Sequence, residues 1–260
     1  MEILAPGYDL EAFFKALASS SHALLILDYD GTLAPFTEDP SQAAPYEGVL
    51  ERLQQLMEAS EVVIMSGRRL DSLKQLLRLP HLPELLGCHG GERLKMGANK
   101  ISRYTLPPDV NKVIARAAEA VAKLAPHLTC EIKPLSVAMH WRGKSPEIAE
   151  KERMLVLDEW SRLMIGQPVE IHPFEQGAEF RPKGVNKGEA VKMLLKDCSS
   201  NAVVAYLGDD FTDEEAFTAL GQRGLKVLVR KNIRRTCANI RLDPPEELFW
   251  FLDRWIKEKA

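Results

Sequence analysis

Short, continuously apolar runs that end in polar residues are the feature that most constrains how this chain folds. Three such runs lie at 23–27, 62–65 and 202–207. A run that is apolar without alternation is typical of a parallel strand whose two faces are both covered. Segments with apolar residues at helical spacing lie between or after these runs, so strands alternate with helices along the chain. This order predicts an α/β fold with a doubly wound parallel sheet. A further strand is expected at 225–229, and helices at 9–19, 46–58, 69–79, 187–197, 213–220 and 245–257.

The middle of the chain follows a different pattern. Here short strands alternate apolar and polar residues, which fits a sheet with one covered face. A helix is expected at 109–125, and another begins at Ser145, a good N-cap residue that precedes a proline. We therefore predict that an α/β module, residues 95–180, is inserted into a core made of residues 1–94 and 181–260. Its strands are expected within 100–105, 128–142 and 169–174.

The composition points to an ordinary globular domain without a nucleic-acid or membrane partner. The 260 residues are 45% hydrophobic, and 37 acidic against 34 basic residues give a formal net charge of −3. Without a basic excess, binding to nucleic acid is not expected, and a phosphorylated ligand would need local cations. The apolar runs are too short to cross a bilayer, and the first residues lack the features of a signal peptide. The four scattered cysteines favour reduced, buried thiols in a cytoplasmic protein over disulfides or a zinc site.

Polar residues gather directly after three of the expected core strands, at 28–32, 66–68 and 208–214. In open α/β sheets, ligands bind beyond the carboxyl ends of the strands. We therefore expect all three clusters to face one crevice. Their convergence is stronger evidence for a site than any single cluster.

The acidic residues of these clusters predict a cation site. Asp28 and Asp30 are two apart, so in an extended chain they point to the same side. Their mutual repulsion is tolerable if a cation lies between them, and Mg²⁺ suits oxygen ligands. Asp209 and Asp213 add negative charge at the same edge. Alternatively, the first cluster is a turn and the second an acidic helix N-terminus, but neither explains why both clusters end buried strands.

Two further positions each allow a structural and a functional interpretation. Ser66 and Arg68 can cap the next helix, or a hydroxyl and a helix N-terminus can bind phosphate, and we expect both. Lys187, just before an expected helix, can be a solvated surface charge. A cation is needed to offset several carboxylates and a phosphate, which favours a functional role for Lys187.

Together these residues resemble a known superfamily. Residues 28–33 match the DxDGT(L) signature of the haloacid dehalogenase superfamily, and Ser66, Lys187 and 208–210 follow in the order of its other motifs. Further local patterns lie at 87–92, at Lys133 with 140–142, at 179–182 and at 208–214. Through these patterns the chain resembles the trehalose-6-phosphate phosphatases more closely still. A small departure is Asn186, where that family often has Asp.

The resemblance implies a fold, a cofactor and roles for individual residues. It implies a Rossmann-like core with an inserted α/β cap, a nucleophilic Asp28, and Asp30 as general acid and base. Mg²⁺ would be bound by Asp28, the Asp30 carbonyl and Asp209, with Asp213 nearby as a further metal-site residue. Ser66 and Lys187 would stabilise the charge of the phosphoryl group. The residues implied to bind the substrate are Arg68, His89, Glu131, Lys133, His140, Arg142 and Glu179.

The polar residues of the inserted module are expected to select the sugar. Glu131 and Lys133 are two apart on an expected strand and share a face, and His140 and Arg142 repeat that arrangement. Glu179 lies near the return to the core. This face can also be the solvated side of a half-exposed sheet. The resemblance favours sugar recognition, with the face closing over the core and excluding water.

Three other functions are considered. The chain can be a phosphatase for another sugar phosphate, of the sucrose-phosphate or mannosylglycerate-phosphate type, because such enzymes share the core. A non-catalytic binding module is disfavoured by the intact acidic and lysine set. A receiver-type signalling domain is disfavoured by Asp30 and by the inserted module. The sequence leaves the oligomeric state open and is compatible with a monomer acting on a small-molecule sugar phosphate.

Overall fold

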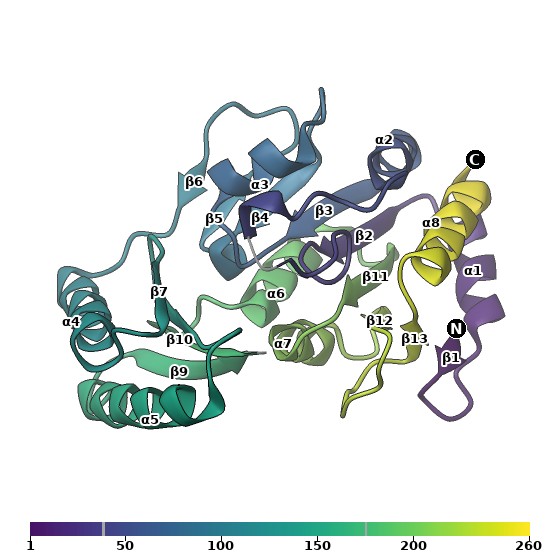
Figure 1. Ribbon diagram of the computed structural model, residues 1–260. Helices are drawn as coiled ribbons and strands as arrows, with labels where there is room; N and C mark the ends of the chain where they lie inside the picture. Colours follow the sequence, from purple (N-terminus) through teal and green to yellow (C-terminus); the bar gives the residue numbers. More distant parts are fainter. Residues whose placement is uncertain (38–39, 175) are drawn as a thin grey trace. The chain divides into compact units, whose positions relative to one another are not determined.

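The computed structural model describes residues 1–37, 40–174 and 176–260 and shows two compact units (Figure 1). The first unit comprises Met1–Ser102 and Asn186–Ala260, and the second comprises Arg103–Val185. In the described ranges, no helix combines the length and the apolar character that crossing a bilayer requires. Among the cysteines, Cys88 is buried as expected, whereas Cys237 is exposed.

The first unit contains a nine-stranded sheet in the order β1-β13-β12-β11-β2-β3-β4-β5-β6. From β13 to β4 the neighbouring strands run parallel, while β1 and β5 pair antiparallel with their neighbours. The predicted doubly wound parallel sheet is therefore confirmed. The strands are β1 (Glu2–Ile3), β2 (Ala23–Asp28), β3 (Glu61–Met65), β4 (Glu84–Gly87), β5 (Glu92–Leu94), β6 (Ser102–Arg103), β11 (Val203–Gly208), β12 (Leu225–Val229) and β13 (Ile240–Leu242).

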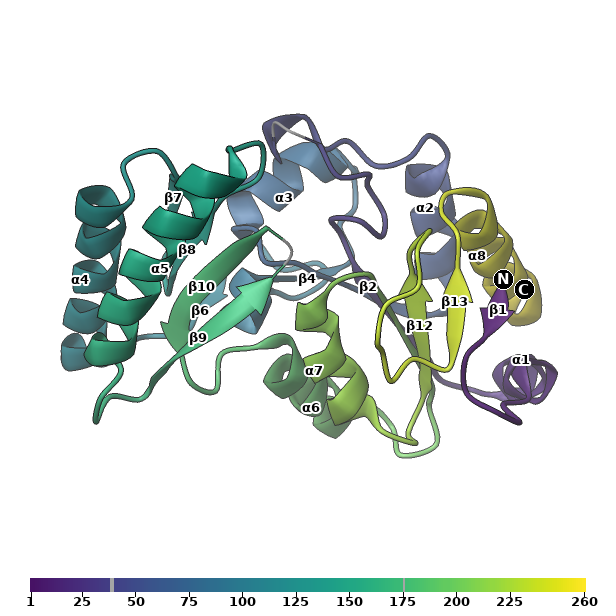
Figure 2. The ribbon, with the colours of Figure 1, turned by 60° about the horizontal axis from the view of Figure 1, so that its bottom comes forward.

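Helices cover both faces of this sheet because its central strands are apolar on both sides (Figure 2). In β2, Leu25 and Leu27 join one core cluster, and Leu24 and Ile26 join the other. The first cluster includes buried residues of α1, α2, α3 and α8, and the second includes those of α6 and α7. The helices of this unit are α1 (Leu10–Ser19), α2 (Val49–Ala59), α3 (Leu70–Leu77), α6 (Lys187–Asp197), α7 (Phe211–Leu220) and α8 (Glu246–Lys259), with 3₁₀ turns η1 (Pro40–Gln42) and η2 (Cys88–Gly90).

Several strands differ from the sequence-based expectation. The short strands β1, β4, β5 and β13 were not predicted, because none carries a long apolar run. The first strand expected in the inserted module is observed as β6, which lies beside β5 in the large sheet instead. The division between the units accordingly falls after Ser102 and before Asn186. That the second unit selects the substrate stays a prediction.

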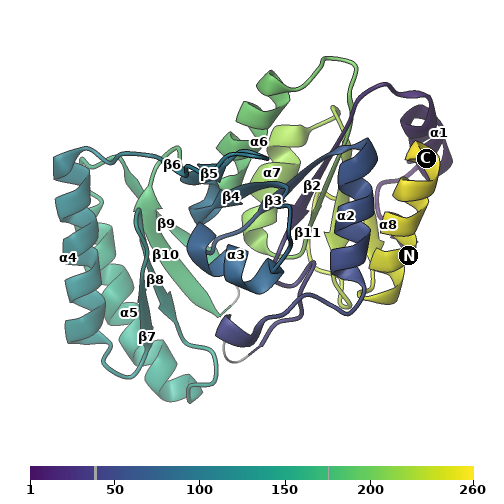
Figure 3. The ribbon, with the colours of Figure 1, turned by 90° about the horizontal axis from the view of Figure 1, so that it is seen from above.

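The second unit consists of a four-stranded antiparallel sheet and two helices that pack together (Figure 3). Val137, Met139 and Phe180 point to one side and form an apolar core with the helices, including Trp160. α5 begins as predicted, with the Ser145 side chain accepting a bond from the Ile148 amide. The elements of the second unit are α4 (Pro108–Leu124), β7 (Thr129–Ile132), β8 (Val137–His140), α5 (Pro146–Leu163), β9 (Val169–Phe174) and β10 (Gly177–Pro182).

The opposite face of this second sheet is polar. The register places Glu131 beside Ala138, and Ala138 and His172 on either side of Glu179, so these four share one face. Side chains alternate between faces in a strand, so this is the face turned away from the apolar core. We call it the cap face, defined by Glu131, Lys133, Ser136, His140 and Glu179.

Candidate active site

The first site element is the turn that follows β2. The carbonyl of Tyr29 accepts bonds from the amides of Leu33 (2.9 Å) and Ala34 (3.0 Å), which folds the chain back sharply. Gly31 has a φ of +81°, and a Cβ atom there would lie 2.3 Å from Asp209 Oδ2. Glycine is therefore required both by the left-handed backbone and by the close approach of the acidic loop after β11.

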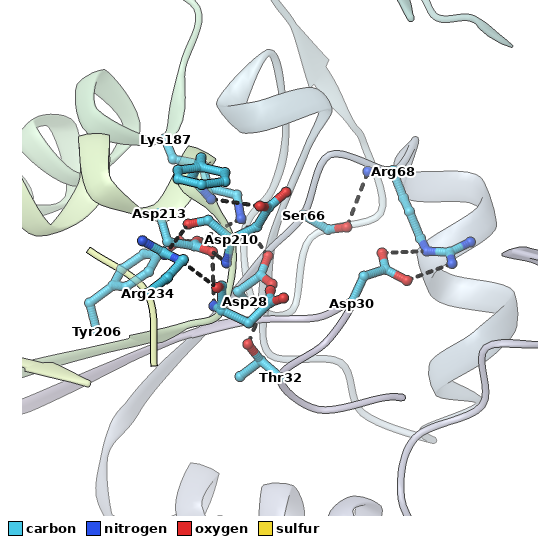
Figure 4. A network of polar contacts seen from close by, with 12 residues as sticks. Asp28, Asp30, Thr32, Ser66, Arg68, Lys187, Tyr206, Asp210, Asp213 and Arg234 are labelled. Carbon is cyan, nitrogen blue, oxygen red and sulfur yellow. Dashed lines mark hydrogen bonds and ion pairs between the residues drawn. The ribbon is translucent and has the colours of Figure 1, made fainter. Parts of the chain in front are cut away.

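A buried ion cluster lies at the adjacent carboxyl ends of β2 and β11. Lys187 Nζ lies 2.6 Å from Asp28 Oδ1 and 2.7 Å from Asp213 Oδ1 (Figure 4). Lys187 is the first residue of α6, where the Asn186 side chain caps the helix through the Glu189 amide at 2.8 Å. Asn186, which departs from the pattern that the resemblance implies, therefore serves as an N-cap.

Burial and charge shift the pKa values in this cluster strongly. Burial raises the pKa of Asp28 to about 8, and Lys187 only partly offsets this. Burial and the neighbouring Asp28 and Asp213 raise the pKa of Asp209 well above its usual range. Burial acts to lower the pKa of Lys187, but Asp213 and Asp28 outweigh it and raise that pKa, so Lys187 stays charged. Three buried carboxyl groups beside one ammonium group therefore disfavour their own ionisation, and a further cation would favour their charged forms.

Asp213 is held by four hydrogen bonds. Its Oδ1 accepts from Lys187 and from the Tyr206 hydroxyl (2.6 Å). Its Oδ2 accepts from the backbone amides of Asp209 (3.0 Å) and Asp210 (2.9 Å). The last bond belongs to a capping box at the start of α7, so the acidic segment is a helix N-terminus as well as part of the cluster.

The residues present fit a magnesium ion. Asp28, Asp209 and Asp213 each offer a carboxylate oxygen, and these atoms lie within 4.8 Å of one another. Both oxygens of Asp209 are buried and have no hydrogen-bond partner among the described residues. A buried carboxylate without hydrogen bonds is costly, and binding a hard cation removes that cost.

Asp30 lies in a different environment from Asp28. Arg68 holds it with two bonds, Nε to Oδ2 at 2.7 Å and Nη2 to Oδ1 at 2.6 Å (Figure 4). The Asp30 side chain is 29% exposed, whereas Asp28 is buried. Two carboxylates in unlike surroundings are what a nucleophile and a proton carrier require.

The loop after β3 differs from the expectation that Ser66 caps the next helix. Ser66 does not cap α3: its hydroxyl accepts a bond from the Arg68 amide (3.1 Å), and the helix begins only at Leu70. The Leu70 amide is bound instead by the buried Glu92, at 2.8 Å. The Arg68 side chain in this loop is thereby left to bind Asp30.

His89 lies against this loop in a strained conformation. Its φ is 56°, and that of Cys88 is 49°. A Cβ atom on Gly67 would lie 2.8 Å from the His89 ring, so the ring and the loop after β3 are in close contact. Left-handed backbone at a non-glycine residue costs about 1–3 kcal/mol and is concentrated at functional sites.

The predicted sugar-binding residues of the second unit form their own network. Lys133 Nζ lies 3.0 Å from Glu179 Oε1, which also accepts a bond from Ser136 (2.6 Å). His140 Nε2 lies 3.0 Å from Glu131 Oε2. Arg142 differs from the expectation, because β8 ends at His140 and Arg142 lies in the following turn.

Three polar residues of these networks were not predicted from the sequence. Tyr206 lies within an apolar strand, where its hydroxyl was the only indication of a polar role. Ser136 follows β7 in a short turn. Arg234 donates bonds to the carbonyls of Asp209 and Asp210 and comes from a loop that carries no motif.

Comparison with known proteins agrees with this geometry. The trehalose-phosphatase family matches residues 26–245. A bifunctional trehalose-6-phosphate synthase/phosphatase of Thermoproteus tenax is 34% identical over 215 residues, covering 82% of this chain and 29% of that protein. A trehalose-phosphate phosphatase of Mycobacterium ulcerans is 30% identical over 243 residues, covering 88% of this chain and 60% of that protein. The chain thus spans less than two thirds of the length of either relative.

A solved structure supports the fold. The C-terminal domain of the Candida albicans trehalose-6-phosphate phosphatase superposes with a TM-score of 0.85 at 21% identity, covering 99% of both chains. The family match and the relatives described above confirm the resemblance inferred from the sequence motifs. Because the family match extends over most of the sequence, from the strand before Asp28 to the start of α8, the chain belongs to the trehalose-phosphatase family.

Proposed function

We propose that this chain is a Mg²⁺-dependent phosphatase that hydrolyses trehalose-6-phosphate to trehalose and phosphate. The observation that carries the proposal is the buried Asp28, held by Lys187 at the carboxyl end of β2. Family membership supports the substrate, since the relatives described above are named for trehalose phosphate.

In the proposed mechanism Asp28 is the nucleophile. One of its oxygens forms a bond to phosphorus while the bond from phosphorus to the sugar oxygen breaks. Asp30, protonated and released from its ion pair with Arg68, gives its proton to the departing sugar oxygen. Asp30 then takes a proton from the water that attacks the aspartyl-phosphate, which releases phosphate and restores Asp28. Lys187 and the Ser66 hydroxyl stabilise the charge on the phosphoryl oxygens.

Asp28, Asp209 and the Asp30 backbone carbonyl would hold the metal ion. When bound, Mg²⁺ would neutralise part of the negative charge of the phosphoryl group. Asp213, predicted to belong to the metal site, has both oxygens occupied by hydrogen bonds. Asp213 stays a predicted metal-site residue, and through these bonds it also orients Lys187 and the Asp209 amide. Arg68 and His89 stay predicted substrate contacts.

Phosphate release from a panel of sugar phosphates tests this function. With Mg²⁺ we expect trehalose-6-phosphate to be hydrolysed in preference to glucose-6-phosphate and sucrose-phosphate. Chelation with EDTA is expected to abolish turnover, and added Mg²⁺ to restore it. Ca²⁺ is expected to inhibit, because its larger and looser coordination misplaces the phosphate. Full activity of metal-free protein would refute the metal requirement, and equal rates on the sugars would refute the substrate.

We also propose that the cap face selects the sugar. Its carboxylates and its lysine are polar groups that a disaccharide can pair through hydroxyls, and a substrate without those hydroxyls would leave them unpaired. Glu131 is 46% exposed, so its removal costs little stability and reports on recognition.

Glu131→Ala and Arg142→Ala are therefore expected to lower kcat/KM for trehalose-6-phosphate by about 10² or more. With p-nitrophenyl phosphate, which needs only the core, the same variants should stay within about twofold of the parent. Glu147→Ala, which removes an exposed carboxylate on α5, is the matched control. Equal losses on both substrates would show that the face is structural.

A further inference from the structure

Arg234 contacts the backbone of the acidic loop after β11 although it comes from the segment after β12. Its Nε donates to the Asp209 carbonyl at 3.1 Å and its Nη2 to the Asp210 carbonyl at 2.6 Å (Figure 4). The Arg234 side chain is only 10% exposed. The mechanism above gives this buried guanidinium no role.

Arg234 is itself fixed from several sides. Its Nη1 donates to Glu214 Oε1 on α7 and to the Arg235 carbonyl, and its Cζ lies 5.0 Å from the centre of the Phe211 ring. The other oxygen of Glu214 accepts from the Cys237 amide at 2.9 Å. A planar guanidinium can make all these bonds at once, whereas a lysine ammonium on a flexible stem cannot.

The Asp209 segment is therefore clamped from two directions. Asp213 Oδ2 binds the amides of Asp209 and Asp210, and Arg234 binds their carbonyls. Because these bonds occupy the backbone of the segment, the Asp209 carboxylate is the group that remains to bind a cation. Both of its oxygens are buried and unpaired among the residues that the structure describes.

We propose that Arg234 is a positioning residue for the divalent-cation site, which it serves by fixing the Asp209–Asp210 backbone before the cation binds. The inference rests on the proposed Mg²⁺ site and deepens it. A ligand held in place in advance loses little conformational freedom on binding, so the cation binds more tightly.

Positioning and simple electrostatics predict opposite effects when Arg234 is removed. A guanidinium near a cation site repels the incoming cation, so loss of its charge alone would tighten binding. Loss of the backbone clamp would weaken binding, because the Asp209 carboxylate would be free to turn away. The direction of the change in Mg²⁺ affinity therefore separates the two roles.

The test is a calorimetric Mg²⁺ titration of the metal-free protein, residues 1–260, with melting temperatures measured with and without Mg²⁺. We expect Arg234→Ala to bind Mg²⁺ about tenfold more weakly and Arg234→Lys to fall in between, since charged hydrogen bonds to two carbonyls are lost or reduced. Arg235→Ala removes the same charge from the adjacent exposed residue and should bind within about twofold of the parent. At saturating Mg²⁺, the kcat of Arg234→Ala should approach that of the parent protein.

Unchanged or tighter Mg²⁺ binding by Arg234→Ala would overturn the inference, and so would a lower melting temperature without any change in affinity. If Arg234→Ala does not fold, Arg234→Lys decides, and parent-like affinity in that variant overturns the inference. Absence of Mg²⁺ binding by the parent protein would instead refute the proposed metal site itself, and the inference with it.

Discussion

Asp28→Asn is expected to abolish hydrolysis of trehalose-6-phosphate while the protein stays folded. Asparagine has nearly the shape of aspartate, but its amide cannot form the bond to phosphorus. Loss of a covalent nucleophile costs about 10⁴-fold or more in kcat. Folding should survive because burial raises the pKa of Asp28, so the fold already disfavours a charge at this position.

Phosphate release and far-UV circular dichroism check this expectation together. Asp253→Asn is the matched control, because Asp253 pairs with Arg52 on the surface of α8 and lies outside the active site. It should keep activity within about twofold of the parent. Activity of Asp28→Asn above about 1% of the parent would exclude Asp28 as the nucleophile.

Lys187→Met is expected to destabilise the protein and to inactivate it. Its side chain is 3% exposed and its ammonium binds both Asp28 and Asp213, so its loss leaves these buried carboxylates without a positive partner. Breaking a buried ion pair on one side costs about 3–5 kcal/mol. The rate of hydrolysis should fall as well, because the phosphoryl group loses the positive charge that stabilises it.

The destabilisation should grow with pH in metal-free protein. Asp28 has an ordinary pKa of 3.8 that burial raises to about 8, and Lys187 opposes this rise. A carboxyl whose pKa is higher in the folded than in the unfolded state binds more protons when folded, so stability falls as pH rises between the two values. Without Lys187 the folded pKa rises further, so stability keeps falling above pH 8, where the fall in the parent protein levels off.

Urea unfolding in EDTA at pH 5.5, pH 8 and pH 9 measures this effect. Lys192→Met, which removes an exposed lysine paired with Glu189 on the same helix, is the matched control. Equal unfolding free energies for the two variants at pH 8 would contradict the assigned role of Lys187. The role would also be contradicted if Lys187→Met lowered the free energy of unfolding by the same amount at pH 5.5 and at pH 9.

The central fold was predictable because its strands carry a strong local signal. β2 is apolar at every position before Asp28, as a strand covered on both faces must be. The strands β4 and β13 were not predictable, because each is short and is stabilised by pairing with strands on both sides, not by an apolar run of its own. β6 was assigned to the wrong sheet for the same reason, since pairing partners do not follow from a two-residue segment.

The candidate site divides in a similar way. Asp28, Lys187 and Asp209 could be found because each follows a strand or begins a helix with a recognisable pattern. Arg234 could not, since it contacts Asp209 across 25 residues of chain and nothing in its own segment indicates that contact. The helix-capping role expected of Ser66 was wrong because Glu92, from another strand, binds the amide at the start of α3.

Trapping of the phosphorylated enzyme tests the central claim most directly. Protein with Mg²⁺ is mixed with trehalose-6-phosphate that carries a labelled phosphoryl group, quenched in acid within one turnover, and digested for mass spectrometry. The proposed mechanism predicts that the label is bound to Asp28 and is absent from Asp28→Asn. Release of labelled phosphate without any transient label on the protein, or label on a residue other than Asp28, would contradict it.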